Sequence, residues 1–286
     1  MMRVLQSIRM LDVRARVLAV DVHPLPYFTV RIAIPEDYPP VAPGQFVMVQ
    51  VGNGLEPYLR RAFSIYDLGN DGQVDEEPAS PARVRSGVVA REMRLLGKVI
   101  GRGTGALGSS RAGDELSILG PLGRGFGLRS GERVALIAGG VGSAALLLLA
   151  RALVGIATFD VFYGGRGRLD LPDAPRFARL AERSGGELHV TTEDGSAGRR
   201  GLVTEPLTER LAAGVYDYLY ACGPMGLLSR LAGLAAEYGV IGEAALETPM
   251  GCGYGACLGC AVPHQDGHYA LCCKDGPVFR FDEVVW

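Results

Sequence analysis

The sequence has almost no net charge, because its 286 residues contain 29 Lys and Arg against 31 Asp and Glu, a formal balance of -2. Without a basic excess the chain has no long-range attraction for phosphate backbones, so we expect no nucleic-acid partner. Hydrophobic residues make up 48% and charged residues 21%, which provides material for packed cores and excludes disorder of the whole chain. The length predicts about two domains, with room for a small third.

Long hydrophobic runs are also missing. The most tempting stretch, residues 134–150, has 17 residues between Arg133 and Arg151, fewer than the roughly 20 that span a bilayer. Its glycines suit a strand, a turn and a helix better than one continuous helix. Arginines interrupt the N-terminal segment, so no secretory signal is read there. These absences predict a protein that does not span a membrane and that resides in the cytoplasm.

Cysteine is absent before Cys222, and five of the six cysteines lie within the final 35 residues. In a reducing compartment such a group indicates metal or redox chemistry rather than disulfides. Cys252, Cys257 and Cys260 follow the spacing C-x4-C-x2-C, and a later cysteine completes the plant-type pattern for a [2Fe–2S] cluster. Neighbouring glycines allow a tight loop whose amides approach the sulfurs, namely Gly251, Gly253, Gly255 and Gly259.

The fourth thiolate comes from one of two adjacent residues, Cys272 or Cys273. Zinc is the alternative metal, although zinc sites usually group their ligands in two C-x2–4-C pairs. A Rieske centre needs two histidine ligands, and His264 and His268 do not occupy cysteine-replacing positions. We expect these two histidines to be solvated loop residues.

The first part of the chain predicts a small antiparallel barrel or sandwich. Short β segments separated by turn signals are expected at residues 15–23, 27–34, 44–51, 61–67, 97–101 and 114–120. Residues 69–87 are polar, acidic and proline-containing, so we expect an exposed loop or insertion there, to which no role is assigned.

From about residue 131, strands alternate with helices, which is typical of a doubly wound parallel sheet. Strands are expected at 132–140, 158–165, 187–195, 217–224 and 243–248, and helices at 143–153, 174–185, 204–214 and 225–239. The tail from residue 249 is too short to form a hydrophobic core unless a metal or another cross-link holds it together. The predicted domains are therefore residues 1–130, 131–248 and 249–286.

Three segments are candidate nucleotide-binding turns. Gly103–Gly108 reads G-x-G-x-x-G but has no following βαβ unit, so it predicts at most a glycine-rich turn for a phosphate. Gly139–Gly142 lies between a strand and an apolar helix, where its amides favour a pyrophosphate or simply form a tight turn. Cys222, Gly223 and Pro224 end another strand at the same edge of the sheet. Alone, Cys222 is more typical of an inert buried thiol.

The polar residues near these turns can be interpreted in more than one way. Arg61 and Ser64 are either an ordinary strand edge or, beside a phosphate-binding turn, a cation for a pyrophosphate and a hydroxyl for a ring nitrogen. Arg166 and Arg168 follow the second strand of the predicted sheet. They are candidates for contact with a ribose 2′-phosphate or for plain solvated charges, so the choice between NAD and NADP stays open.

The order of these motifs resembles that of the ferredoxin–NADP reductase superfamily. The tail, from Leu246 and Glu247 through MGCGYGACLGC to CCKDGPVFRFDEVVW, is similar to the electron-transfer subunits of bacterial NAD-dependent dihydroorotate dehydrogenase. This resemblance covers nearly the whole chain. It implies a β plus α/β fold with an antiparallel FAD-binding β-barrel, a doubly wound parallel-sheet nicotinamide domain and a small C-terminal [2Fe–2S] lobe. The implied cofactors are FAD and the cluster, with NAD as co-substrate.

The resemblance also implies residue roles. FAD is expected at Arg61, Ala62, Phe63, Ser64, Leu96, Gly97, Lys98, Gly103 and Thr104, with the arginine at the phosphates and the serine near the isoalloxazine. Gly97 and Lys98 depart from the family's aromatic–Arg pattern, so backbone contacts are expected there. NAD is expected at Gly139, Gly140, Val141, Gly142, Cys222, Gly223 and Pro224. Ser64 and Cys222 would form the catalytic environment of flavin and nicotinamide.

The cluster ligands implied by the resemblance are Cys252, Cys257, Cys260 and Cys273, because the family's last ligand directly precedes the x-Asp-Gly-Pro-Val-Phe stretch. The implied function is electron transfer in pyrimidine (UMP) biosynthesis. Electrons would pass from an FMN-containing dihydroorotate dehydrogenase subunit through the cluster and FAD to NAD+, within a heterotetramer. Alternatives with the same cofactors would serve a hydrogenase, a sulfide-linked reductase or a ferredoxin-linked transhydrogenase. A different class would be a non-enzymatic, zinc-stabilised interaction module.

Overall fold

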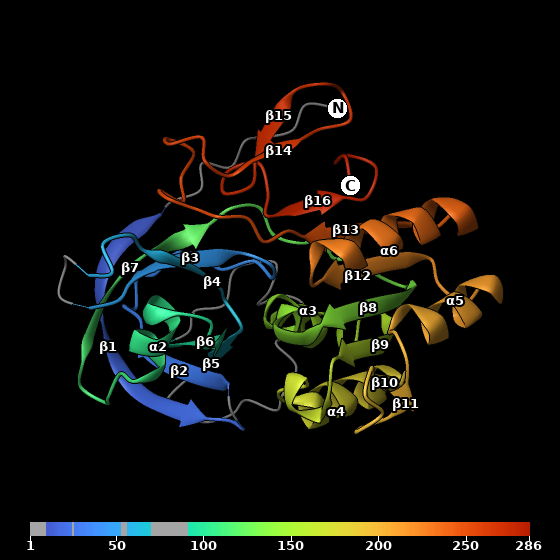
Figure 1. Ribbon diagram of the computed structural model, residues 1–286, viewed down its shortest axis with the longest axis horizontal. Helices are drawn as coiled ribbons and strands as arrows, with labels where there is room; N and C mark the ends of the chain where they lie inside the picture. The colour runs from blue at the N-terminus through green and yellow to red at the C-terminus, as the bar shows by residue number, and fades with distance from the viewer. Residues whose placement is uncertain (1–9, 25, 53–55, 70–90) are drawn as a thin grey trace.

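The computed structural model describes residues 10–24, 26–52, 56–69 and 91–286 (Figure 1). Apart from Gly69, the loop predicted at residues 69–87 lies outside the described residues. Figure 1 shows two parts of the chain side by side, each with its own sheet, and the C-terminal segment lies across the top of both.

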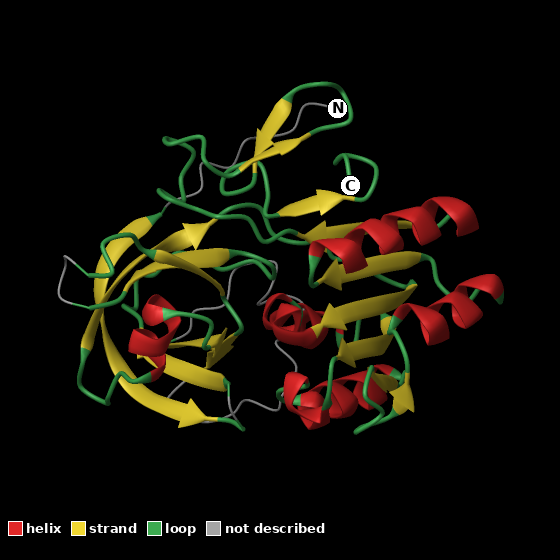
Figure 2. Cartoon of the chain, in the orientation of Figure 1, coloured by secondary structure: helices red, strands yellow, loops and turns green. Residues whose placement is uncertain are grey.

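The first part of the chain forms a curved seven-stranded antiparallel sheet in the order β4-β3-β7-β1-β2-β6-β5. Its strands are β1 (Leu11–Val22), β2 (Tyr27–Ala33), β3 (Phe46–Gln50), β4 (Arg61–Ser64), β5 (Asp67–Gly69), β6 (Glu92–Lys98) and β7 (Glu115–Leu122). The sheet curls around a short helix, α2 (Arg102–Gly108), as Figure 2 shows. The predicted antiparallel barrel is thereby confirmed.

Two local predictions in this part are wrong. Residues 103–108 do not form a turn, because they belong to α2, whose Leu107 is fully buried in the barrel core. The hydroxyl of Thr104 accepts the N–H groups of Ile100 and Gly101 at 2.9 and 3.2 Å and so caps the start of this helix. The strand expected at 97–101 is displaced, since β6 ends at Lys98.

The second part is a mostly parallel sheet in the order β11-β10-β9-β8-β12-β13-β16, as the alternating pattern predicted. Its parallel strands are β8 (Arg133–Gly139), β9 (Thr158–Gly165), β10 (Leu188–Thr192), β11 (Arg199–Arg200), β12 (Tyr218–Cys222) and β13 (Ile241–Ala245). Its helices are η1 (Gly140–Ala145), α3 (Leu147–Leu153), η2 (Arg168–Asp170), α4 (Ala174–Ser184), α5 (Thr204–Ala212) and α6 (Met225–Tyr238). The helix expected at 143–153 thus begins with a 3-10 turn.

Strand β8 shows why this part is apolar on both faces. Val134 and Leu136 pack into the core formed with α3 and α4, whereas Ala135 and Ile137 pack into the core formed with α5 and α6. A strand covered by helices on both sides has no polar face, which explains the uninterrupted hydrophobic run. The run at residues 134–150 divides among β8, η1 and α3. Among the described residues, no helix is both long enough and apolar enough to cross a membrane.

The C-terminal segment joins both parts. It contains the hairpin β14 (Ala261–Pro263) and β15 (Tyr269–Leu271), followed by β16 (Val278–Arg280), which pairs antiparallel with β13 and completes the second sheet. Its loop at Gly253 presses onto the barrel, because a Cβ there would lie 2.4 Å from Cγ of Met48 in β3. The segment therefore sits where the barrel and the parallel sheet meet.

A buried carboxylate fixes the barrel to the parallel-sheet part. Asp67 in β5 is 1% exposed and accepts hydrogen bonds from Arg151 in α3 and Arg176 in α4. Arg94 of the neighbouring strand β6 lies 3.7 Å from the same carboxylate. Charges this deeply buried are tolerated only when they are paired and hydrogen-bonded, so this group constrains how the two parts meet.

A second set of polar contacts crosses the same junction. Asp170 in η2 accepts hydrogen bonds from the hydroxyl of Tyr27 at 2.7 Å and from Nζ of Lys98 at 2.8 Å. The hydroxyl of Tyr66, next to Asp67, donates to the carboxylate of Asp173. Barrel side chains therefore hold the loop between β9 and α4 in place.

We predict that Asp67→Asn destabilises the folded chain by about 3 to 5 kcal/mol, because it leaves buried guanidinium groups without their counter-charge. Urea unfolding followed by circular dichroism measures this change. The matched control is Asp12→Asn, which removes the ion pair with Arg60 at a carboxylate whose side chain is 55% exposed. The control should change stability by no more than about 0.5 kcal/mol, and equal losses in both variants would contradict the assignment.

Candidate functional site

A cavity of about 660 Å³ lies at the carboxyl ends of the parallel strands, the edge where open α/β sheets bind ligands. We call it the sheet-edge cavity. Its wall includes the ends of β8, β9 and β12 through Gly139, Gly140, Val141, Gly142, Gly164, Gly165, Gly223 and Pro224. The structure thus places together all the residues predicted to contact NAD except Cys222, which lines a second cavity.

The turns after β8 and β12 touch backbone to backbone. A Cβ on Gly142 would lie 2.3 Å from the carbonyl oxygen of Cys222, and a Cβ on Gly139 would lie 2.9 Å from Cδ of Pro224. Gly140 has a φ of +55°, which also favours glycine. Because these two turns consist largely of glycine, they present main-chain groups rather than side chains to the cavity. Such a surface suits a pyrophosphate.

The second cavity, of about 410 Å³, opens between the barrel and the first turn of the parallel sheet. We call it the barrel cavity. Eight of the residues predicted to hold FAD line it, namely Arg61, Ala62, Phe63, Ser64, Leu96, Gly97, Lys98 and Thr104. The ninth, Gly103, lies against Arg61, since a Cβ there would be 2.7 Å from its Nε. The assignment of these residues to a flavin remains a prediction.

Arg61 supplies positive charge to the barrel cavity. Its guanidinium donates to the carbonyl oxygens of Leu59 and, at 3.4 Å, Arg60. Within the described part of the chain, no carboxylate forms an ion pair with Arg61. A guanidinium held by carbonyl groups, with no counter-ion among the residues that the structure describes, fits the phosphates of a dinucleotide.

Three of the predicted flavin residues also have structural roles. Thr104 caps α2, and Lys98 pairs with Asp170 across the junction. At Gly97 a Cβ would lie 2.4 Å from the ring of Phe28, so packing alone requires glycine at this position. The departure from the family pattern therefore coincides with packing inside the barrel at Gly97 and with a contact across the junction at Lys98.

The two cavities adjoin, and Lys98, Val141 and Glu247 line both of them. The sequence reasoning gave Glu247 no role, although it follows β13 at the same sheet edge as the other candidate residues. Its side chain is exposed to the cavities, and partial desolvation by the surrounding protein raises the pKa of its carboxyl. Burial likewise raises the pKa of Cys222 well above its usual value, so its thiol stays protonated near neutral pH.

Four of the tail cysteines form two close pairs within residues 252–273, a segment that we call the cluster-binding loop after its predicted role. The N–H of Cys257 donates to Sγ of Cys252 at 3.5 Å, and Sγ of Cys260 lies 3.2 Å from Sγ of Cys273. Although desolvation raises it, backbone N–H donors led by that of Cys257 lower the pKa of Cys252 to about 6, which favours a thiolate. Two thiol pairs with amides directed at the sulfurs fit a [2Fe–2S] cluster.

The fifth tail cysteine is directed away from these pairs. The thiol of Cys272 is fully buried and donates to the carbonyl oxygen of Leu246 at 3.5 Å. Its neighbour Cys273 instead faces Cys260, whose Sγ also accepts the N–H of Cys273 at 3.4 Å. This geometry supports the proposal that Cys273 rather than Cys272 is the fourth ligand.

The two arginines considered for a 2′-phosphate differ in their contacts. Arg168 donates twice to the carbonyl oxygen of Ser196, at 3.0 and 2.8 Å, and does not line the sheet-edge cavity. Arg166 lines the cavity together with Glu193, and its Nε lies 3.4 Å from a carboxylate oxygen of Asp170. Acidic groups beside Arg166 fit a free ribose hydroxyl better than a second phosphate.

We predict that Cys273→Ala abolishes binding of the cluster, whereas Cys272→Ala retains it, because only the former removes a thiol that faces Cys260. Iron and sulfide per chain, measured after anaerobic reconstitution, test this difference. Alanine is chosen because it offers no ligating atom. The reverse result, with iron lost only in Cys272→Ala, would overturn the proposed ligand set.

Known structures with this architecture bind flavin and nicotinamide nucleotides. The structure of the NADH-dependent reduced ferredoxin-NADP oxidoreductase superposes with a TM-score of 0.79 at 26% identity, covering 95% of this chain and 90% of that chain. A ferredoxin NADP+ reductase from Neisseria gonorrhoeae with bound FAD and NADP superposes with a TM-score of 0.61 at 18% identity, covering 80% and 92%. The second similarity shows the fold alone.

Sequence comparison is more specific. Residues 247–285 match the family model of the iron-sulfur cluster binding domain of dihydroorotate dehydrogenase B. The electron transfer subunit of dihydroorotate dehydrogenase B (NAD(+)) from Desulforamulus reducens is 36% identical over 249 residues, which cover 85% of this chain and 87% of the relative. Similarity of this extent spans the barrel, the parallel sheet and the cluster-binding loop. The chain therefore belongs to the family of electron-transfer subunits of NAD-dependent dihydroorotate dehydrogenase B.

Proposed function

We propose that this chain carries electrons from a dihydroorotate-oxidising catalytic subunit through a [2Fe–2S] cluster and FAD to NAD+, in pyrimidine biosynthesis. One observation carries the proposal. The barrel cavity is lined by Met250 and Pro277 of the C-terminal segment and by Val141, which also lines the sheet-edge cavity. The candidate sites for cluster, flavin and nicotinamide therefore follow one another in the order that electron transfer requires.

The side chains of the barrel cavity would bind and orient the flavin. Arg61, which pairs with no carboxylate among the described residues, would offer its guanidinium to the phosphates, and Ser64 in β4 would offer a hydroxyl near the ring. When bound, FAD exchanges a hydride with nicotinamide and single electrons with the cluster, which neither of those two partners can do directly with the other.

The turns of the sheet-edge cavity would bind and place the nicotinamide nucleotide. Gly139–Gly142 and Gly223 would offer backbone groups to its pyrophosphate, and the wall shared with the barrel cavity would bring its reactive end next to the flavin site. Cys222 contributes a protonated, uncharged thiol at this boundary. Glu247, which lines both cavities, contributes a carboxyl group at the same boundary.

The partner would dock over the cluster-binding loop. Cys257 is exposed there, and large apolar side chains nearby are open to solvent, with Tyr254 at 50%, Leu258 at 63% and Tyr269 at 70% exposure. An apolar surface around a near-surface metal site suits a protein partner. We propose an FMN-containing catalytic subunit, a heterotetramer and a place in the cytoplasm, with neither nucleic acid nor membrane as partner.

The alternative functions considered for this chain have less support. Subunits that serve a hydrogenase, a sulfide-linked reductase or a ferredoxin-linked transhydrogenase would share these cofactors, but the family of this chain is that of dihydroorotate dehydrogenase B. A non-enzymatic zinc module accounts for neither of the two adjoining cavities, and the matched C-terminal domain is one that binds an iron–sulfur cluster.

We predict that the purified chain, loaded with FAD and cluster, oxidises NADH with ferricyanide as acceptor but does not oxidise dihydroorotate. The reason is that no part of the described fold provides a second flavin barrel for that substrate. Adding the catalytic subunit should restore dihydroorotate-dependent formation of NADH, followed by absorbance. Dihydroorotate oxidation by the single chain would refute the proposal, and so would a failure of the reconstituted complex to reduce NAD+.

A further inference from the structure

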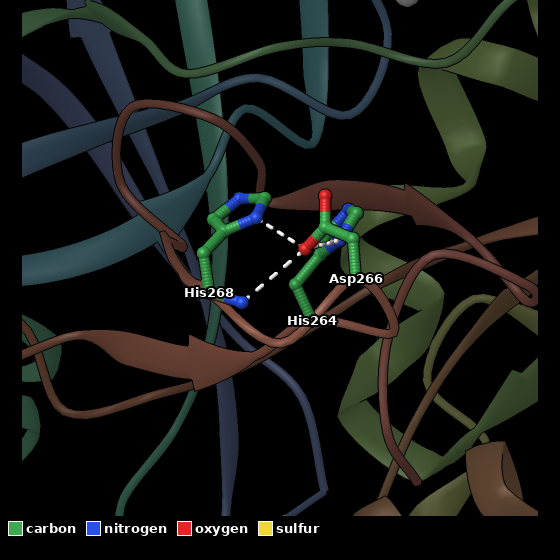
Figure 3. A group of neighbouring side chains, drawn as sticks. All are labelled: His264, Asp266 and His268. Atoms are coloured by element: carbon green, nitrogen blue, oxygen red, sulfur yellow. Dashed lines mark hydrogen bonds and ion pairs between the residues drawn. The ribbon is translucent and has the colours of Figure 1, made fainter.

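The turn between β14 and β15 gathers two of the four histidines of the chain around one aspartate. Figure 3 shows His264, Asp266 and His268 within this turn, with both imidazoles directed at the carboxylate. The expectation that both histidines are solvated loop residues is wrong for His264, whose side chain is only 21% exposed. The proposed electron-transfer function makes no use of this group.

The three side chains converge through specific atoms. Nδ1 of His264 lies 2.8 Å from Oδ1 of Asp266, and Nδ1 of His268 contacts the same oxygen. One ligating atom from each of the three residues lies within 4.8 Å of the others. The two rings stack with centroids 4.5 Å apart and an angle of 26° between their planes. Both histidines thus present the same ring nitrogen to a common point.

The backbone holds this arrangement in advance of any ligand. The N–H of His264 donates to the carbonyl of His268 at 2.9 Å, and the N–H of Gly267 donates back to the carbonyl of His264 at 3.0 Å. The intervening Gln265 donates to the carbonyl of Glu283 at 2.8 Å, which ties the turn to the C-terminal residues. A ligand would therefore meet donors that are already ordered, so little conformational entropy is lost on binding.

The group also has unused capacity. Nδ1 of His264 is buried and has no hydrogen-bond partner among the described residues, because its approach to Asp266 is close but poorly aligned. Across the described ranges, Asp266 forms ion pairs with these two histidines and with no Lys or Arg. An ionised carboxylate and an imidazole nitrogen without a hydrogen bond can both act as metal ligands, because a bound cation replaces the proton at such groups.

A second cluster of the same residue types behaves differently. Asp160, Glu187 and His189 also bring ligating atoms within 4.8 Å of one another. There, however, one oxygen of Asp160 already accepts the hydroxyl of Tyr216 at 2.6 Å and faces Arg133 at 3.1 Å. That carboxylate is neutralised by the fold, so this cluster serves as a matched control rather than as a site.

We propose that His264, Asp266 and His268 bind a divalent transition-metal ion of the Zn²⁺ type through Nδ1, Oδ1 and Nδ1, with water completing the coordination. Two imidazoles and one carboxylate form a borderline donor set that suits zinc and its neighbours rather than magnesium or calcium. Zinc holds such ligands at about 2.0 to 2.2 Å, so the three atoms need only small side-chain rotations to share one ion.

The proposed metal site lies at the opposite end of the β14–β15 hairpin from the cysteines, so a bound ion would stabilise the hairpin. Strand β14 begins directly after Cys260, and strand β15 ends directly before Cys272 and Cys273. An ion bound at the turn would close the far end of the hairpin whose near end carries one pair of proposed cluster ligands. Metal binding at this turn does not depend on the proposed electron-transfer function.

Equilibrium dialysis of the full chain against Zn²⁺, with zinc and iron measured per chain, tests the proposal. The variants are the double substitution His264→Gln with His268→Gln, the single substitution Asp266→Asn, and the control His189→Gln. We expect the wild type and His189→Gln to bind one more zinc than the double variant. Asp266→Asn should bind zinc at least about tenfold more weakly, because it loses a charged ligand.

Zinc that enters the cysteine loop would appear equally in all variants and would accompany a loss of iron, so the difference between variants isolates the turn. Equal zinc in the wild type and the double variant would overturn the proposal. A loss of zinc in His189→Gln as large as in the double variant would overturn it as well. If the histidines only share hydrogen bonds with Asp266, the wild type will bind no zinc beyond that of the double variant.

Discussion

The arrangement of the candidate sites depends on how the barrel meets the parallel sheet, and Asp67 governs that junction. Its buried carboxylate accepts hydrogen bonds from Arg151 and Arg176 of the second part. Three guanidinium groups around one carboxylate leave few ways to dock the two parts without exposing an unpaired charge to the apolar interior. The barrel cavity and the sheet-edge cavity share a wall because this docking brings β6 to the edge of the parallel sheet.

Close contacts at two glycines are the second constraint on how the candidate sites are arranged. Gly142 against Cys222, and Gly253 against Met48, are contacts that any side chain would block. The first brings two turns of the parallel sheet together at one edge, and the second presses the cluster-binding loop onto the barrel. The second contact therefore brings the segment that carries the cluster cysteines against the strand next to the barrel cavity. Electron transfer between cofactors and hydride transfer to nicotinamide both need such short separations, so glycine at these positions is explained by geometry as well as by local flexibility.

Much of the architecture could be predicted from local sequence signals. The alternation of strands and helices after residue 131, the spacing of Cys252, Cys257 and Cys260, and the turn glycines are all short-range patterns. Long-range pairs are not encoded in this way, and so the contacts of Asp67 and the role of Glu247 as a shared cavity wall were not predicted. The helix at Gly103–Gly108 was missed because its glycines disfavour a helix, whereas burial of Leu107 in the barrel core stabilises one.

The contacts of the tail needed the structure for a similar reason. Cys272 and Cys273 are adjacent, and only the fold shows that the first thiol points to Leu246 while the second faces Cys260. His264 and Asp266 are separated by one residue, yet their convergence depends on a turn held by Glu283 from the C-terminal residues. In both cases tertiary contacts decide which of several nearby side chains can act together.

The central claim, that the sites work in the order nicotinamide, flavin and cluster, is tested most directly by rapid anaerobic mixing of NADH with the loaded chain. Flavin absorbance and the paramagnetic resonance signal of the reduced cluster are followed over the same time course. We expect the flavin bands to bleach first and the cluster signal to appear afterwards, at a rate independent of NADH concentration once the nucleotide saturates. A cluster that is reduced while the flavin remains oxidised throughout would contradict it.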